Sequence, residues 1–364
     1  VQSIAGGGGS SATNDGDTVR LGAISTAGSS GSLPTVQSGN VTVINTQNLS
    51  TNAIGSVGLL AQSIAGGGGY VSRIGDGNIS DIDFGSRGEM NSLAGNIVVR
   101  NRAVSINTVS DYSPAFVAQS IGGGGGIGLM DSGGIGTTLL GALDNNSGFS
   151  DSGNIDIINN AILSTQGQYS PALGVQSVGG GGGVVIYVSS DLALGSENHQ
   201  GQAKAGDLDV TNTNQIQTVG NGSVGIFLQS LGFGGGIVGG ASGLASLGAK
   251  GGISDSLGSA GVIDLKSFGA SIRTSGIGSA GLVAQSIGGG GGFVGFSGQG
   301  ANLGGNQLSN VNAGNVSVTS SSVIETIGAG APAQLIQSIG GGGGFVGLTT
   351  SQAISIGGND LSNA

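Results

Sequence analysis

Few side chains in this 364-residue chain are suited to catalysis or metal binding. The single histidine, His199, lies in a polar stretch, and the chain contains no cysteine. A zinc site needs several nitrogen or sulfur ligands, so we expect His199 to be a surface residue. The sequence therefore predicts no metal site, no catalytic site and no cofactor site.

Paired carboxylates are the other chemistry to consider, because polysaccharide-cleaving enzymes work with two acidic groups. Asp81 and Asp83 stand two residues apart, as do Asp207 and Asp209, so each pair would share one face of a strand. Neither pair recurs at regular intervals along the chain. The segment Asp15–Asp17 has the acidic residues of a calcium loop but lacks the repeated motif of one. We predict solvated carboxylates and no enzyme, with a carbohydrate-active enzyme as the least favoured alternative.

Composition excludes further classes of function. Nine Lys and Arg stand against 19 Asp and Glu, a net charge of −10, and no basic stripe is available for a phosphate backbone. No uninterrupted apolar run is long enough for a transmembrane helix. Glycine supplies 82 residues, yet 37% of the chain is hydrophobic, enough for a long core. We predict no nucleic-acid partner, no membrane insertion by this segment and an ordered chain.

The elements that would position any site come from an internal repeat. One phrase of the form AQSIGGGGG occurs seven times, and its glutamines are 60, 57, 57, 53, 56 and 52 residues apart. They are Gln2, Gln62, Gln119, Gln176, Gln229, Gln285 and Gln337. The spacing predicts a single repetitive domain over 1–364, with about six repeats of roughly 56 residues. Because the chain begins in the middle of a repeat, we expect it to be an internal piece of a longer protein.

Each repeat contains short patterns typical of β-strands. A threonine precedes the glutamine by 11 residues, as at Thr108, and Leu or Ile precedes it by 13, as at Ile106. We expect these Leu and Ile side chains to form an inward-facing row. Further upstream lies Gly-Asn-Val-x-Val or a variant, as in 39–43. Three strands would form one triangular coil, and the remainder after the glycine run could form a second. This predicts an all-β parallel solenoid with roughly two coils per repeat, about 55 to 60 Å long.

The glycine runs allow three interpretations: a phosphate cradle, a flexible linker or an ordered extended strand. No run continues into the Lys-Ser/Thr of a P-loop, and a linker in every repeat would interrupt the rod, so we expect order. Whether the glutamine and glycine positions are buried or exposed stays open. Core packing is expected for the aromatic residues after the runs, with contact to a partner as the alternative. These are Tyr70, Phe84, Phe149, Tyr187, Phe293, Phe296 and Phe345.

The phrase GLVAQSIGGGGG in 281–292, together with the upstream Gly-Asn-Val-x-Val and Ile-x-Thr patterns, resembles the repeats of large bacterial autotransporter passengers and related outer-membrane adhesins. The resemblance covers essentially the whole chain. It implies a right-handed β-solenoid, or β-helix, exported to the bacterial cell surface and attached to the outer membrane. It also implies a role in attachment or matrix formation.

These expectations combine into two functions. The first is a non-catalytic stalk or adhesin at the cell surface. The alternative is a repeat subunit of a self-assembling extracellular filament or sheath. The partners expected are other rods of the same kind and a host-surface or polysaccharide ligand.

Overall fold

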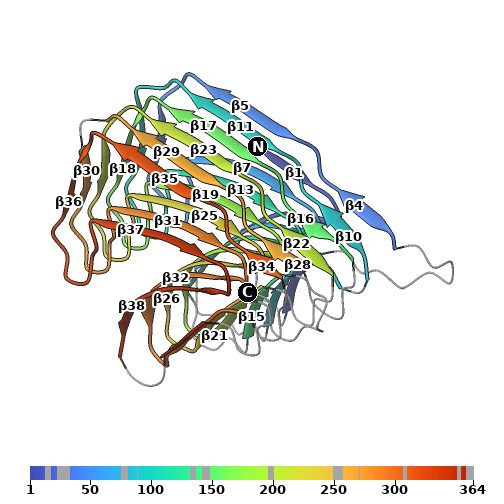
Figure 1. The fold of residues 1–364 in the computed structure, drawn as a ribbon. Helices are drawn as coiled ribbons and strands as arrows, with labels where there is room; N and C mark the ends of the chain where they lie inside the picture. Colours follow the sequence, from blue (N-terminus) through green and yellow to red (C-terminus); the bar gives the residue numbers. More distant parts are fainter. Residues whose placement is uncertain are drawn as a thin grey trace.

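The computed structural model describes residues 1–12, 18–22, 33–74, 81–87, 89–131, 137–141, 148–195, 201–248, 257–269, 271–305, 310–350 and 354–357. Regular secondary structure within these ranges consists entirely of β-strands, and every strand pairing in them is parallel. Strands from successive repeats lie side by side along a single stack (Figure 1). The predicted all-β parallel solenoid is confirmed.

Each repeat contributes one strand to each of six positions around the stack. The glutamine sheet contains the strands of the repeated phrase: β1 (Gln2–Ile4), β7 (Leu59–Ile64), β13 (Phe116–Ile121), β19 (Leu173–Val178), β25 (Ile226–Leu231), β31 (Leu282–Ile287) and β37 (Gln334–Ile339). The glycine sheet follows it in the chain: β2 (Gly8–Ala12), β8 (Gly68–Ile74), β14 (Gly125–Asp131), β20 (Gly182–Val188), β26 (Gly235–Ala241), β32 (Gly291–Ser297) and β38 (Gly343–Thr349).

The next two positions have shorter strands. The base sheet consists of β3 (Thr18–Leu21), β9 (Asp81–Phe84), β15 (Thr137–Leu140), β21 (Asp191–Leu194), β27 (Ala245–Leu247), β33 (Ala301–Leu303) and β39 (Ile354–Ile356). The short strands form two separate three-stranded sheets. These are β4 (Thr35–Gln37), β10 (Asn91–Leu93) and β16 (Ser150–Asp151), then β22 (Gln202–Lys204), β28 (Leu257–Ser259) and β34 (Val311–Asn312).

Two six-stranded sheets complete the turn. The cover sheet contains β5 (Val41–Asn45), β11 (Ile97–Asn101), β17 (Ile155–Asn159), β23 (Leu208–Asn212), β29 (Ile263–Ser267) and β35 (Val316–Ser320). The threonine sheet contains β6 (Leu49–Thr51), β12 (Ser105–Thr108), β18 (Ile162–Thr165), β24 (Ile216–Thr218), β30 (Ser271–Thr274) and β36 (Val323–Thr326).

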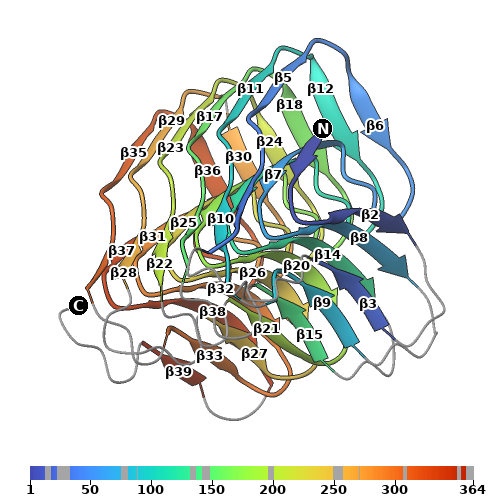
Figure 2. The ribbon, with the colours of Figure 1, turned by 90° about the vertical axis from the view of Figure 1, so that its right-hand side faces the viewer.

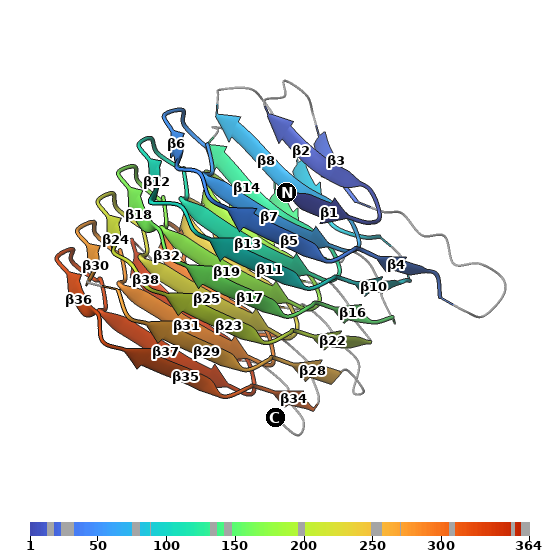
Figure 3. The same ribbon diagram turned by 90° about the horizontal axis from the view of Figure 1, so that it is seen from above.

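The expectation of two coils per repeat is wrong, because one repeat forms one rung. Gln62 pairs in register with Gln2 on one side and with Gln119 on the other, with no intervening coil. The view from above shows the cover strands in repeat order, β5, β11, β17, β23, β29 and β35 (Figure 3). Seven rungs at the usual strand spacing give a stack about 30 Å long, half the predicted length.

A whole repeat fits into a single rung because the chain folds back within that rung. The cover and threonine sheets lie over the glutamine sheet, the glycine sheet lies beneath that, and the base sheet lies beneath the glycine sheet (Figure 2). Separate apolar clusters fill the spaces between these layers. In β13, Phe116 and Ala118 pack toward the cover and threonine sheets, whereas Val117 packs toward the glycine sheet. The glutamine sheet is thus buried on both faces.

The repeated glutamine lies on the face of its sheet that meets the glycine sheet. Gln62, Gln119, Gln176, Gln229 and Gln285 are fully buried. From Gln2 to Gln285, each Nε2 donates to the Oε1 of the glutamine in the next rung over 2.6 to 2.8 Å. From Gln62 onward, each Nε2 also donates to a glycine carbonyl seven residues further along, over 3.2 to 3.5 Å. The amide therefore joins successive rungs to one another and the glutamine sheet to the glycine sheet.

The serine after each glutamine points to the opposite face and holds the corner before the cover sheet. Ser120 Oγ donates to the Gly95 carbonyl at 2.9 Å and accepts the Gly153 N–H of the following rung at 2.8 Å. The same pair of bonds recurs at Ser63 and Ser177. The Gln-Ser dipeptide therefore binds two separate parts of the rung.

Two further polar ladders lie in the upper layers. The predicted inward row of Leu and Ile before the threonines is confirmed in the main core. The adjacent threonines turn their hydroxyls to the next corner, as when Thr165 Oγ1 donates to the Ser170 carbonyl at 2.6 Å. At the end of the cover strands, the buried amides of Asn101, Asn159 and Asn212 form a chain, with bonds of 2.7 and 2.8 Å. This asparagine ladder was not among the features predicted from the sequence.

The glycine runs are ordered, as predicted, and the backbone requires them to be glycine. Gly123 to Gly126 all have positive φ, from 77° to 142°. A Cβ added to Gly125 would lie 1.9 Å from the carbonyl oxygen of Gly182 in the next rung, and one on Gly126 would lie 2.0 Å from that of Gly69 in the preceding rung. Any side chain here would enter the hydrogen-bonded stack itself.

Gln176→Leu should lower the free energy of unfolding by at least about 2 kcal/mol, because the buried amides of Gln119 and Gln229 each lose a partner at about 1 to 3 kcal/mol per group. Chemical denaturation followed by circular dichroism measures the change. The control is Gln166→Leu at an exposed position, which should change stability by less than about 0.5 kcal/mol. Equal losses for the two variants would contradict a structural role for the glutamine ladder.

Gly126→Ala should destabilise the chain by more than about 3 kcal/mol, since it adds a steric clash to an unfavourable φ. Gly9→Ala is the matched control: its φ of 152° is similar, but an added Cβ meets no atom within 4 Å. The control should lose only about 1 to 3 kcal/mol from backbone strain. Thermal melting of both variants measures the two losses of stability. Equal losses would show that backbone strain alone, without a steric clash, makes glycine necessary at these positions.

Candidate functional site

The carboxylates singled out from the sequence lie in different surroundings. Asp83 is buried, and its Oδ2 accepts a hydrogen bond from Arg87 Nη2 at 2.7 Å. Asp207 is exposed at the corner before β23, where its Oδ1 accepts the Val262 N–H at 2.7 Å. Asp209 is exposed on the outer face of the cover sheet. The prediction of solvated positions is therefore confirmed for Asp207 and Asp209 and wrong for Asp83, whose ion pair accompanies its burial.

Other candidates from the sequence cannot be placed. His199, Asp15–Asp17 and the side chain of Asp81 lie outside the part of the chain that the structure describes. Within the described part of the chain, no three His, Cys, Asp or Glu side chains are grouped so that they could hold a metal ion. The same residues contain no helix that could span a membrane.

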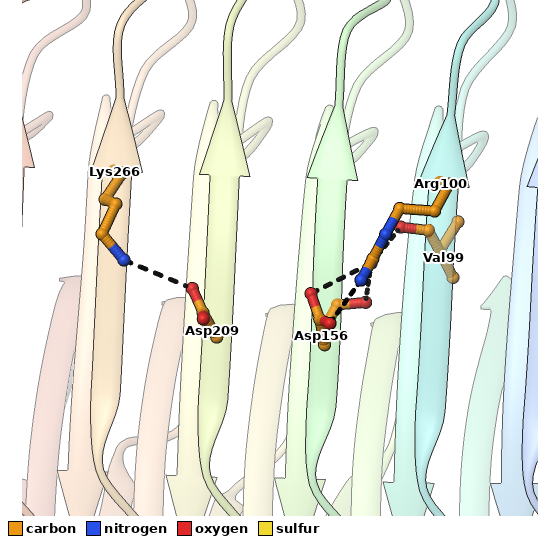
Figure 4. Close-up of polar contacts among 5 residues, drawn as sticks. All are labelled: Val99, Arg100, Asp156, Asp209 and Lys266. Atoms are coloured by element: carbon orange, nitrogen blue, oxygen red, sulfur yellow. Dashed lines mark hydrogen bonds and ion pairs between the residues drawn. The ribbon is translucent and has the colours of Figure 1, made fainter.

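A charged ladder crosses the outer face of the cover sheet (Figure 4). Asp156, Asp209 and Asp264 occupy the same register on β17, β23 and β29. Neighbouring strands are about 4.8 Å apart, so three like charges stand in a row, an arrangement that is unfavourable by itself. The row is flanked by Arg100 on β11 and Lys266 on β29.

The two cations offset this repulsion. Arg100 binds Asp156 with both terminal nitrogens, at 3.0 Å to Oδ1 and 2.5 Å to Oδ2. Lys266 Nζ lies 2.7 Å from Asp264 Oδ2 and 3.6 Å from Asp209 Oδ1. The hydrogen bond to Asp264 raises the pKa of the Lys266 ammonium. Each carboxylate of the ladder thus has a cation near it.

Asp151, which was not among the candidates predicted from the sequence, is a half-buried carboxylate at the junction of the two short-strand sheets. Burial raises its pKa, against the opposing effect of its hydrogen bonds. Its Oδ1 accepts the Lys204 N–H at 3.0 Å, and its Oδ2 accepts from Gln202 Nε2 at 3.1 Å. Because Asp151 is on β16 and both partners are on β22, the side chain bridges two sheets that share no strand pairing. Its environment has a structural explanation.

An aromatic seam runs along the stack where the corner before the glutamine sheet meets the glycine sheet. We define it as Tyr70, Tyr112, Tyr169, Tyr187 and Phe296, all half-buried. It includes all four tyrosines of the chain. The Tyr112 and Tyr169 rings are 6.0 Å apart and nearly parallel, and Tyr187 lies 5.5 Å from Tyr169. Burial, with a further contribution from Tyr187, raises the pKa of the Tyr169 phenol.

Some of the aromatic residues that the sequence predicts to be in the core are buried, and others lie at the surface. Phe84 and Phe293 are buried, as expected. Phe345 is partly buried and stacks on Phe293 at 5.2 Å. Phe149 is 49% exposed, which contradicts core packing there. Tyr112 and Tyr169 were not among the candidates. One feature of the sequence could have identified them: tyrosine occupies a turn position that is glycine in other rungs, at Gly55, Gly222, Gly278 and Gly330. Tyr112 and Tyr169 have φ of 57° and 50° there.

No protein-family model matches this chain, and comparisons with curated proteins and with solved structures give no match.

Arg100→Gln should lower the free energy of unfolding by up to about 1 kcal/mol at low ionic strength, because Asp156 then faces Asp209 without its cation. The loss should shrink at about 1 M salt, where the Debye length is about 3 Å. Urea denaturation at the two salt concentrations measures it. Arg273→Gln is the control, because Arg273 pairs at 3.3 Å with one carboxylate, that of Glu325, and not with a row of carboxylates. A loss that is equal at low and high salt would contradict an electrostatic ladder.

Proposed function

We propose that this chain is a non-catalytic segment of a bacterial cell-surface stalk or adhesin that mediates attachment or matrix formation. The observation that carries the proposal is the continuous ladder of glutamine amides through all seven rungs of the glutamine sheet, buried in the five inner rungs. A segment that holds a binding region away from a cell has to resist bending and pulling. In-register backbone pairing and amide ladders in every rung supply that resistance.

The surface is also consistent with such a segment. Only 8% of the chain is charged. On the cover sheet, the outward side chains of β23 are Asp209 and Thr211, while Leu208, Val210 and Asn212 are buried. A polar, weakly charged outer face suits a protein that works outside the cell. The resemblance of the AQSIGGGGG repeats to autotransporter passengers points to display at the outer membrane.

Display on a bacterium that does not adhere tests the proposal. Cells that carry the chain at their surface should attach to abiotic or host-derived surfaces, or form matrix, more than cells that carry only the anchor. The Gln176→Leu variant should reduce attachment under shear flow, because a weakened rung yields under load, while Gln166→Leu should not. Attachment no greater than that of the anchor alone would overturn the adhesive role. Electron micrographs of long regular fibres of the isolated chain would instead favour the filament.

A further inference from the structure

The aromatic seam is interrupted by a pocket of about 130 Å³. Tyr169 lies on one side of it, and Phe296 and Leu348 lie on the other. Gly278 leaves its space open, Gly222 lies against the Tyr169 ring, and Asn221 contributes a polar side chain. No charged residue is part of its lining, so the pocket suits an uncharged group.

The pocket lies one rung beyond the level at which two columns of the stack lose their side chains, because the rings of Tyr169 and Tyr187 fill the space at that level. At the corner before the glutamine sheet, the column reads Tyr112, Tyr169, Gly222, Gly278. On the glycine sheet, Tyr187 pairs with Gly240, which is followed in the next rung by Phe296. A Cβ added to Gly278 would meet only one atom within 4 Å, the Gly295 carbonyl oxygen at 3.9 Å. The tyrosine stack therefore stops at Tyr169 beside empty space.

We propose that this pocket binds a planar aromatic ring, which continues the stack of Tyr112 and Tyr169 and packs against Phe296. The existing pair, 6.0 Å apart with an interplanar angle of 5°, shows the arrangement that an added ring extends. The volume is close to that of an apolar cavity of about 150 Å³ that accommodates benzene. This inference goes beyond the proposed stalk or adhesin function, which does not depend on this pocket, so failure of one leaves the other intact.

Asn221 favours a ring that carries a hydrogen-bond acceptor, such as a hydroxyl group. Its Oδ1 accepts the Ile277 N–H at 2.9 Å. That bond fixes the orientation of the amide, so Nδ2 is the atom placed to donate to a ligand oxygen. A phenol combines the flat ring and the acceptor. It could be supplied by a free phenolic compound or by a tyrosine side chain of another protein.

Titration of the whole chain with phenol, followed by saturation-transfer NMR and calorimetry, tests the site. Cyclohexanol is the matched probe, since it has the same hydroxyl and ring size but no aromatic face. Phenol should bind saturably and at least about threefold more tightly than cyclohexanol, the preference expected from aromatic stacking. Absence of saturable phenol binding, or equal affinity for the two probes, would overturn the proposal.

Two variants locate the bound ring. Gly278→Tyr should abolish phenol binding by filling the space. Its backbone φ of 67° is close to the values at Tyr112 and Tyr169, so the fold should tolerate the new ring. Phe296→Ala should weaken binding about three- to tenfold by removing the opposite wall. The control is Phe268→Ala, which changes a phenylalanine that is 51% exposed and does not line this pocket. Unchanged phenol affinity in both pocket variants, with native circular dichroism, would contradict the location.

A final comparison separates the two sources of the ring. The peptide Gly-Tyr-Gly and free phenol are titrated in parallel, with Gly-Leu-Gly as the peptide control. Tighter binding of Gly-Tyr-Gly would assign the site to a protein side chain, and tighter binding of phenol would assign it to a small molecule. Binding of Gly-Leu-Gly equal to that of Gly-Tyr-Gly would contradict recognition of an aromatic ring.

Discussion

The side-chain amide of the repeated glutamine holds the layers of this stack together. Its two N–H groups are committed to different partners, the glutamine of the next rung and a glycine carbonyl of the strand beneath. Buried amides are unfavourable unless they are hydrogen-bonded, and here every rung satisfies the one before it. The glycine strand has to lie close to the glutamine sheet to accept this bond. The fold-back of the chain within each rung brings the two strands into this contact, while positive φ and the close backbone of neighbouring rungs require the glycines themselves.

Much of the fold could be predicted from the recurrence of a few residues. Constant spacing between Gln62, Gln119 and Gln176 indicated a stack, and the row of Leu and Ile before each threonine correctly marked its core. The number of coils could not be predicted this way. A strand such as β13, buried on both faces, lacks the alternating pattern that distinguishes inside from outside, so the layers beneath it could not be assigned from the sequence.

The chemistry of individual positions was less predictable than the fold. Carboxylates two residues apart, such as Asp207 and Asp209, suggested a shared face, but the partners of Asp209 come from other rungs and are distant in sequence. Tyr169 is conspicuous only when it is compared with Gly222 and Gly278 at the same turn. Such comparisons need the register of the stack, and the varying repeat length obscures that register after each glycine run.

The glutamine ladder has a direction. Each glycine carbonyl can only accept a hydrogen bond, so it requires Nε2 on its side of the glutamine amide. This places every Oε1 toward the preceding rung, and the asparagine amides of the cover sheet are oriented in the same sense. The dipoles of these side chains add along the stack instead of cancelling, and aligned amides polarise one another. The aligned side-chain amides therefore give the stack a dipole moment along its axis, with partial charges of opposite sign at its two ends.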